Sequence, residues 1–358
     1  MEDYSELAHA IKSWGKELGF QQIGITDTDL QKHEQHLQSW LLKGFGADML
    51  YMSKHGDKRS RPDLLIPGTI RIVSARMDYL PDDDKIEKTL SSHSKAYIAR
   101  YALGRDYHKV IRARLRALTD RINDHLADLG IPDFSARVFI DSGPVLEKGA
   151  AEKAGLGWIG KNTLLLNEAA GSWFFLGEIY TNIPLPIDEA KTSNRCGSCT
   201  ACMDVCPTKA IVAPYQLDSR LCISYHTIEN RGVIPIAIRE RMGNRIFGCD
   251  DCQAVCPWNR YAQPTSEPDF KPRNDFDSAT LLALFSWSEA EFSKNTEGSA
   301  IRRTGYDGWL RNISIALGNA DYDPEILAAL TDKQGQTSEM VKEHVEWAIK
   351  QQLAKEPA

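Results

Sequence analysis

The residues with the clearest chemical meaning are the eight cysteines of this 358-residue chain. They form two runs, Cys196–Pro207 with the spacing C-x2-C-x2-C-x3-C-P and Cys249–Pro257 with the spacing C-x2-C-x3-C-P, separated by a single cysteine, Cys222. The first spacing is the one that holds 4Fe–4S clusters in bacterial two-cluster proteins, where the fourth cysteine of each run ligates the other cluster. Cys222 supplies the thiolate that the second run lacks. The pattern therefore predicts two 4Fe–4S clusters, one held by Cys196, Cys199, Cys202 and Cys256, and the other by Cys206, Cys222, Cys249 and Cys252.

Structural zinc and disulfide bonds are the two alternatives for these cysteines. Zinc takes four ligands, usually from paired C-x2-C knuckles, and a third cysteine followed by C-P exceeds that need. Disulfides belong to oxidising compartments, whereas the start of the chain, Met1–Glu6, has neither the basic nor the apolar character of a signal peptide. The spacing favours iron–sulfur clusters over both alternatives.

Composition limits the classes of partner that the protein can have. The formal net charge is −6, which argues against indiscriminate binding of nucleic acid. No apolar run approaches the roughly 20 residues of a membrane span. We therefore expect a cytoplasmic protein with no membrane association, in a compartment reducing enough to keep thiolates on iron.

Asp141 is a candidate general acid. It follows a predicted strand over 137–140 and precedes Ser-Gly-Pro, and sites are often placed on loops at strand ends. Burial can raise the pKa of a carboxyl group until it donates a proton near neutral pH. The alternative is structural, because Asp141 also stands where it could cap a helix beginning near Val145.

Two further segments combine a structural reading with a functional one. Tyr107 and His108 are proton carriers in the first turn of a long predicted helix that Asp106 could cap. The glycine-rich segment 155–163 allows a ligand to approach the backbone closely. It matches no phosphate-binding fingerprint, so a plain tight turn is equally consistent with it.

Arginines gather near aromatic residues despite the negative net charge. Arginine beside an aromatic ring suits contact with phosphate and stacking on bases, as in RNA binding. A solvated charged face is the alternative. The residues that we predict to contact RNA lie before and after the second cysteine run: Arg231, Arg245, Arg302, Arg303 and Arg311.

Hydrophobic periodicity predicts a mixed α+β fold in three parts. Apolar residues at helical spacing indicate helices over 7–18 and 107–127, and strands are predicted at 22–26, 69–75, 137–140, 164–166 and 173–180. The last two are expected to pair across a turn at Gly171. This alternation predicts a layered α/β domain over 1–184, followed by a ferredoxin-like cluster domain over 185–265.

The remaining segment, 266–358, predicts a helical tail. Helices are expected over 279–285, 310–317, 324–330 and 338–353, with Pro324 at a first helical position. Paired helices of this kind are typical of a helical repeat such as HEAT.

Several motifs, taken in order along nearly the whole chain, resemble the epoxyqueuosine reductase family. The resemblance rests on the two cysteine runs and on six further segments: Arg100–His108, Phe139–Pro144, Gly157–Asn162, Thr181–Pro184, Cys222–Ser224 and Gly298–Arg303, the last leading to Arg311-Asn312. The ferredoxin-type runs alone fit many proteins, and the combination is far more specific than any one motif.

The resemblance implies a cobalamin bound in the N-terminal domain, close to the first cluster, with the two 4Fe–4S clusters delivering electrons to it. It implies that epoxyqueuosine at the wobble position of a tRNA loses its epoxide oxygen, with Asp141 as proton donor and with Tyr107 and His108 near the substrate. Positions near the corrin fall on Arg59, Lys161, Asn162 and Ser224. The protein is expected to act as a monomer with a flavodoxin- or ferredoxin-type electron donor.

Two other functions remain possible from the sequence. One is a cobalamin enzyme of the reductive dehalogenase type that acts on a small molecule, and the other is an iron–sulfur electron-transfer module without chemistry of its own. Corrin absorption together with salt-sensitive tRNA binding would distinguish an epoxyqueuosine reductase from both of these alternatives.

Overall fold

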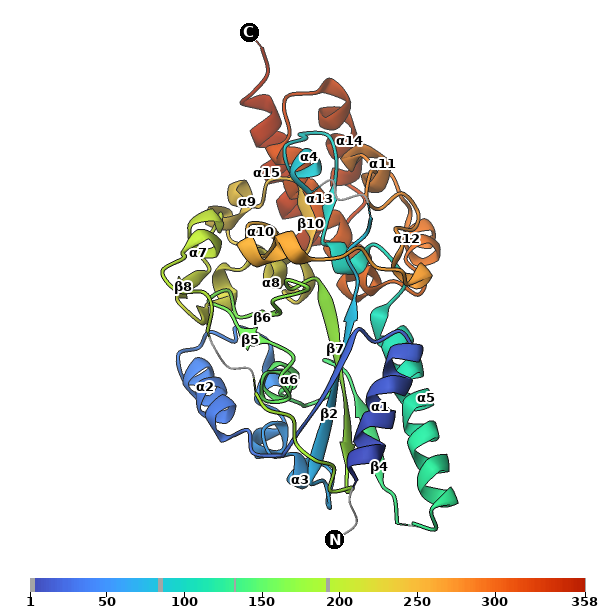
Figure 1. The fold of residues 1–358 in the computed structure, drawn as a ribbon. Helices are drawn as coiled ribbons and strands as arrows, with labels where there is room; N and C mark the ends of the chain where they lie inside the picture. The colour runs from blue at the N-terminus through green and yellow to red at the C-terminus, as the bar shows by residue number, and fades with distance from the viewer. Residues whose placement is uncertain (1–3, 83–85, 132, 191–193, 358) are drawn as a thin grey trace.

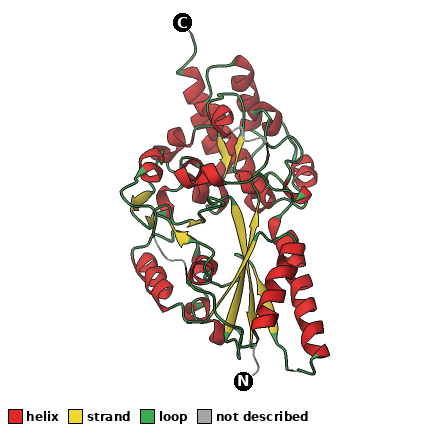
Figure 2. Cartoon of the chain, viewed as in Figure 1, coloured by secondary structure: helices red, strands yellow, loops and turns green. Residues whose placement is uncertain are grey.

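The computed structural model describes residues 4–82, 86–131, 133–190 and 194–357. The strands of the main sheet lie in the N-terminal half of the molecule, and helices make up most of the other half (Figure 2). The two chain ends lie at opposite ends of the molecule (Figure 1). None of the helices in the described part is both long and apolar enough to span a bilayer.

A four-stranded antiparallel sheet organises the N-terminal half. Its order is β1 (Gln22–Thr26), β2 (Arg71–Asp78), β7 (Phe174–Thr181) and β4 (Ala136–Phe139). The register places Ser74 opposite Glu178 and Arg76 opposite Leu176. Alternate residues of each strand therefore face two different environments.

One face of this sheet packs against α1 (Ser5–Glu17) and α5 (Tyr107–Asp128), which run beside each other in Figure 1. The apolar stripe of α5, which includes Ile111, Leu115 and Leu118, is buried against Val73 and Ile179. Gly177 permits this close approach, since a Cβ there would lie 2.8 Å from Ile111 and Leu115 side-chain atoms. This face is an ordinary apolar core.

The opposite face is covered by α6 (Glu147–Lys153) and is unusually polar for a buried surface. It carries Ser74, Arg76, Asp78 and Glu178, all less than a tenth exposed. Further helices on this side are α2 (Gln31–Leu42) and α3 (Pro62–Leu65). A polar face in a core requires partners, and so marks a candidate ligand surface.

The predicted pairing of 164–166 with 173–180 is wrong. The strand β6 (Leu165–Leu166) pairs with β5 (Trp158–Ile159), and only the bridge between Asn167 and Gly171 continues toward β7. The glycine-rich segment is thus one arm of a small hairpin. Gly157 is required there because a Cβ would meet the Leu166 carbonyl oxygen at 2.0 Å.

Short elements carry the cysteines. They are α7 (Ala201–Val205), β8 (Ile211–Ala213), β9 (Gln216–Leu217), α8 (Ile223–Ile228), α9 (Ile236–Met242), β10 (Arg245–Phe247) and α10 (Asp251–Ala254). From the N-terminal half, β3 (Tyr97–Ile98) pairs in parallel with β10, and α4 (Ile86–Leu90) lies nearby.

The tail is helical, as the periodicity predicts. Its helices are α11 (Leu281–Phe285), α12 (Glu289–Asn295), α13 (Gly305–Asn319), α14 (Pro324–Gln334) and α15 (Glu339–Leu353), of which α12 was not predicted. Asp323 caps α14, with Pro324 at its first position. One hydrophobic cluster joins Ile98, Phe247, Ile313 and Val345, so all three predicted parts share a core.

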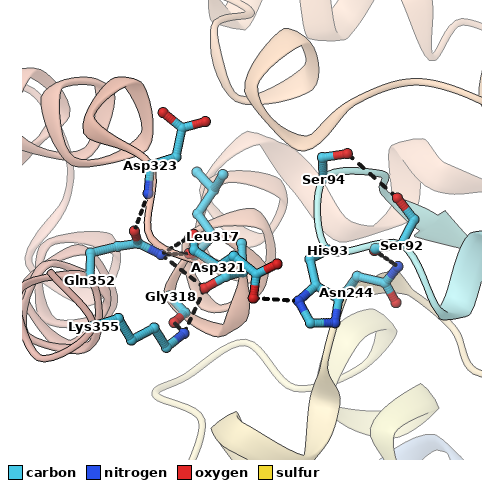
Figure 3. Close-up of polar contacts among 11 residues, drawn as sticks. Ser92, His93, Ser94, Asn244, Leu317, Gly318, Asp321, Asp323, Gln352 and Lys355 are labelled. Carbon is cyan, nitrogen blue, oxygen red and sulfur yellow. Dashed lines mark hydrogen bonds and ion pairs between the residues drawn. The ribbon is translucent and has the colours of Figure 1, made fainter. Parts of the chain in front are cut away.

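The end of α13 shows how tightly the tail is joined to the rest (Figure 3). Gln352 donates to the Leu317 carbonyl at 2.7 Å, and Lys355 donates to the Gly318 carbonyl at 2.8 Å. These bonds satisfy carbonyl groups that a helix end leaves unpaired. Asp321 then pairs with His93 at 2.7 Å, which ties the tail to the N-terminal half.

Candidate active site

A cavity of about 280 Å³ opens beside the end of the sheet, between β7 and the loop that follows β4. Three tyrosines and Phe175 form an aromatic wall, and Asp141, Glu147 and Lys148 supply its charged groups. The residues that the structure contributes to this cavity are Tyr79, Tyr101, Tyr107, Asp141, Glu147, Lys148, Leu164, Leu165, Ser172, Phe174, Phe175 and Leu176.

Asp141 faces this cavity and does not cap a helix. The N-cap of α6 is Leu146, which makes no side-chain capping bond. The Tyr107 hydroxyl donates to Oδ2 of Asp141, and His108 Nε2 lies 2.6 Å from Oδ1. With its side chain 40% exposed, Asp141 remains open to a ligand, which favours the functional reading of this residue.

The start of α5 positions the two partners of Asp141. Asp106 caps the helix by accepting from the His108 backbone N–H at 3.0 Å, and its carboxylate also lies 2.8 Å from His108 Nδ1. The Tyr107 ring stacks on Phe175 with a centroid separation of 4.2 Å. Because one ring nitrogen of His108 is fixed by Asp106, the other is directed at Asp141.

The charge distribution differs from the one that we expected. Burial lowers the pKa of His108, but hydrogen bonds to Asp106 and Asp141 outweigh burial and raise that pKa to about 9. Burial alone would raise the pKa of Asp141, as predicted, yet the hydrogen bond and charge of His108 hold it below its usual value. The pair is therefore an imidazolium and a carboxylate, and the proton resides on His108.

Sequence reasoning missed Glu147 and Glu178. Burial, followed by the charge of Asp141, raises the pKa of Glu147 to about 8. Glu178 is fully buried on the polar face of the sheet, and burial raises its pKa well above the usual value. One carboxyl oxygen of Glu147 and both of Glu178 have no partner within the described protein. A glutamate within the apolar strand of residues 173–180 was the available signal.

The structure brings together the four cysteines of the first predicted set and three of the four of the second, and the assignment of each set to one cluster stays a prediction. A second cavity of about 220 Å³ is lined by Cys196, Cys199, Cys202 and Cys256. The charged neighbours of Cys252 include Cys206 and Cys222. Among the described residues, no group of three or more His, Cys, Asp or Glu side chains is arranged to hold a single metal ion.

The second cysteine set, which consists of Cys206, Cys222, Cys249 and Cys252, adjoins the active-site cavity through Cys252. Cys252 is followed by Gln253, a buried residue that donates to the Ser172 carbonyl at 2.8 Å and to the Tyr79 hydroxyl at 3.2 Å. Ser172 and Tyr79 both line the cavity of Asp141. A direct packing path therefore connects these thiolates with the site.

Of the four residues predicted near the corrin, Lys161 and Asn162 connect the N-terminal part to the cysteine-carrying part. Lys161 donates to the Gly197 and Cys199 carbonyls at 2.7 and 2.8 Å, and Asn162 donates to the Cys252 carbonyl at 3.2 Å. Ser224 Oγ lies 3.5 Å from the Cys249 carbonyl. Buried Arg59 donates to the Tyr51 carbonyl at 2.7 Å and leaves its Nε without a partner.

The predicted RNA-contacting arginines divide into two groups. Arg302 and Arg303 are exposed, and the exposed residue Arg231 donates to the Thr304 and Arg303 carbonyls at 2.9 and 2.6 Å. Arg311, only 1% exposed, donates instead to three backbone carbonyls, including that of His226 at 2.7 Å. Arg245 is paired with Asp251 and mostly buried. Direct RNA contact is therefore a wrong prediction for Arg245 and Arg311.

Comparison with known proteins decides the family. The chain is 57% identical over 348 residues to an epoxyqueuosine reductase of Pseudomonas aeruginosa, covering 97% of this chain and 95% of the relative. It is 53% identical over 356 residues to that of Escherichia coli K12, covering 99% and 92%. The chain belongs to the epoxyqueuosine reductase family.

Family models and solved structures agree with this membership. Residues 59–142 match the model described as "Epoxyqueuosine reductase QueG, DUF1730", and residues 195–259 match a "4Fe-4S double cluster binding domain". A Bacillus subtilis epoxyqueuosine reductase, solved with its catalytic aspartate loop swung out of the active site, is 29% identical with a TM-score of 0.85, covering 97% of this chain and 90% of that one. An epoxyqueuosine reductase with an epoxyqueuosine-modified tRNA stem loop is 27% identical with a TM-score of 0.82, covering 97% and 99%. The chain therefore has a mixed helix–sheet fold with a double 4Fe–4S domain, and it belongs to an oxidoreductase family.

Proposed function

We propose that this protein reduces epoxyqueuosine to queuosine in tRNA, and that the hydrogen-bonded row His108–Asp141–Tyr107 supplies protons to the epoxide oxygen. The observation that carries the proposal is this row, which faces a cavity beside cysteines of the double-cluster domain. Family membership supports the choice of reaction, since the related enzymes carry this name. It also sets the dehalogenase-like and pure electron-transfer readings aside.

The chemistry requires two electrons and two protons for each epoxide. Both carbon–oxygen bonds of the ring break, a carbon–carbon double bond forms, and the oxygen leaves as water. An alkoxide is a poor leaving group unless it is protonated, so an acid beside the oxygen lowers the barrier. The electrons come from the iron–sulfur domain.

The structure supports a proton relay rather than a permanently protonated aspartic acid. His108 holds a proton on the nitrogen that faces Asp141 at 2.6 Å, and Asp141 passes it to the substrate as the substrate's oxygen becomes basic. Tyr107 fixes the second oxygen of the same carboxylate. Glu147, whose pKa is raised to about 8 by burial and then by Asp141, is a second protonated acid in the cavity.

The polar lining of the cavity fits a cobalamin. Its corrin periphery carries many amide groups, and Glu147, which lines the cavity, has a buried carboxyl oxygen without a partner in the described protein that such an amide would satisfy. Arg59 and the loop of Lys161 and Asn162 would hold its edge, with Ser224 beside the second cysteine set. When bound, cobalamin supplies a strongly reducing cobalt centre. We assign the second cysteine set, rather than the first, to the position nearest to it, because Gln253 connects that set to the cavity wall.

The tRNA would bind at the mouth of the cavity, across the junction with the tail. Arg303 stacks over Tyr51 at 6.0 Å and pairs with Glu229 at 2.9 Å, and its charge also acts on Asp141. Arg302 and Arg231 extend this surface. We propose that the tail, 266–358, is a HEAT-like repeat that contributes to this surface, and that 1–184 and 185–265 are the cobalamin and cluster domains of a cytoplasmic monomer.

The proposal is tested by mass spectrometry of tRNA from cells lacking the protein. Epoxyqueuosine should accumulate, and the wild-type protein should restore queuosine. Asp141→Asn should retain both clusters and bound cobalamin, measured by absorption, but fail to restore queuosine. Normal queuosine in the deletion strain would refute the function, and full rescue by Asp141→Asn would remove Asp141 from the reaction.

A further inference from the structure

The surface around the first cysteine set is basic and open. The cavity formed by Cys196, Cys199, Cys202 and Cys256 is also lined by Lys161, Arg195 and Arg260. Arg195 pairs with Glu168, which offsets part of its charge. Cys199 is exposed. The first cysteine set therefore opens to solvent beside three cations, on a protein whose net charge is −6.

Aromatic and aliphatic side chains lie among these cations. Arg260 donates to the Tyr261 hydroxyl at 2.7 Å and lies 4.7 Å from that ring, and Arg195 lies 6.0 Å from the Trp258 ring. Tyr261 and Val255 remain 39% and 37% exposed. Arginine close to an exposed aromatic ring, beside exposed apolar groups, is typical of protein–protein contact sites.

The position of this surface indicates where electrons enter the protein. The second cysteine set adjoins the active-site cavity through Gln253, whereas the first set adjoins solvent. Electrons that reach the active site through the clusters must therefore enter at the first set. An electron donor has to bring its own redox centre close to Cys199, which requires it to cover this basic rim.

We infer that the surface of Arg195, Trp258, Arg260 and Tyr261 is the docking site of a small acidic electron-carrier protein. The inference rests on the proposed function, which needs two electrons for each epoxide. A carrier that gives one electron is oxidised by one unit at each encounter, so two encounters supply one turnover. Opposite charge on the carrier would accelerate the encounter and make it sensitive to salt.

Two other roles are available to the same cations. They could serve only to offset the negative charge of the cluster itself, without a partner protein. They could instead extend the tRNA surface, because phosphate is also an acidic ligand. Each role predicts a different result in the following experiment.

The test compares the double variant Arg195→Glu/Arg260→Glu with a matched control, Arg112→Glu/Arg116→Glu. Both control residues are exposed on α5, on the other side of the molecule from α7 in Figure 1. Cluster-loaded protein is mixed anaerobically with reduced flavodoxin in a stopped-flow instrument, and with dithionite in a parallel series. Binding of oxidised flavodoxin and of a tRNA stem loop is measured by titration, and reduced ferredoxin replaces flavodoxin in a further series.

We expect the test variant to bind flavodoxin at least about tenfold more weakly and to be reduced by it about tenfold more slowly at low salt. Its reduction by dithionite and its tRNA affinity should match those of the control. Equal loss with dithionite would show that the cations serve the cluster alone, and weakened tRNA binding with normal flavodoxin reduction would assign the surface to RNA. Reduction by flavodoxin at the control rate would also overturn the inference. Turnover of a modified stem loop by the wild-type protein with dithionite is measured alongside, so that failure of the proposed reaction is distinguished from failure of the docking site.

Discussion

His108 lies between two carboxylates, and this arrangement determines where the site keeps its proton. Asp106 holds one ring nitrogen at 2.8 Å, and Asp141 holds the other at 2.6 Å. An imidazole in that position is charged at neutral pH, so Asp141 need not be a neutral acid before the substrate binds. In the proposed relay, the proton is held on His108, one hydrogen bond away from the Asp141 carboxylate that would deliver it.

The first prediction concerns pH. Because burial is outweighed by Asp106 and Asp141, the pKa of His108 is raised to about 9. The imidazolium is present below that pH and is lost as pH rises through it. Single-turnover reduction of a modified stem loop should therefore be constant near neutrality and fall above about pH 9. In His108→Gln the rate should be low, and the fall above about pH 9, the alkaline limb of the profile, should be absent. An unchanged alkaline limb in this variant would mean that another group titrates there.

At the scale of the helix, α5 both supports the sheet and orients the site. Asp106 caps it, and the cap and the ion pair to His108 come from the same carboxylate. A single residue thus has a structural role and a role in positioning, which two substitutions can separate.

We expect Asp106→Ala to lower the free energy of unfolding by about 1 kcal/mol through loss of the cap. Asp106→Asn should keep the cap and the thermal midpoint. Both variants remove the negative charge that raises the pKa of His108, so the alkaline limb should move to lower pH in both. Thermal unfolding and pH–rate profiles measure the two effects. If the alkaline limb moved only in the alanine variant, the negative charge of Asp106 would not be what raises the pKa of His108.

The helix α13 provides a second prediction at this scale. Arg311 satisfies the carbonyls of His226, Asn230 and Gly232 inside the core. Arg311→Met leaves those carbonyls unpaired and should destabilise the protein by on the order of 3 kcal/mol. Arg302→Met, at an exposed position, should change stability by less than about 0.5 kcal/mol. Similar thermal midpoints for the two variants would contradict the structural role of Arg311.

At the scale of the whole molecule, the proposed tRNA surface and the proposed carrier-docking surface are two separate basic regions. Replacing Arg302 and Arg303 by Gln should weaken binding of a tRNA stem loop and reduce the slope of log affinity against log salt by about 0.7 for each phosphate that the variant no longer neutralises. Arg112→Gln/Arg116→Gln is the matched control. An unchanged salt slope in the test variant would place the RNA elsewhere on the protein.

Much of this molecule was predictable from local pattern. The strand β1 and the start of α5 lie where periodicity put them, and the cysteine spacing anticipated that Cys196, Cys199, Cys202 and Cys256 lie together. Long-range packing was not predictable. The pairing of β3 with β10 has no local signature in the sequence. The burial of Arg311 has none either, because an arginine near aromatic residues gives the same sequence pattern on a surface and in a core. The charge state of Asp141 depends in the same way on a neighbour 33 positions earlier in the chain, His108.

The shared hydrophobic core has a consequence for folding during synthesis on the ribosome. Its members run from Ala96 to Ala348, so the packing around β10 and Cys249 is complete only when the last helix has left the exit tunnel. Domains that fold during synthesis need their own finished cores. We therefore expect the second cysteine set to receive its iron only after α15 has left the exit tunnel. A stalled nascent chain that ends before α13 should take up none into the second cysteine set.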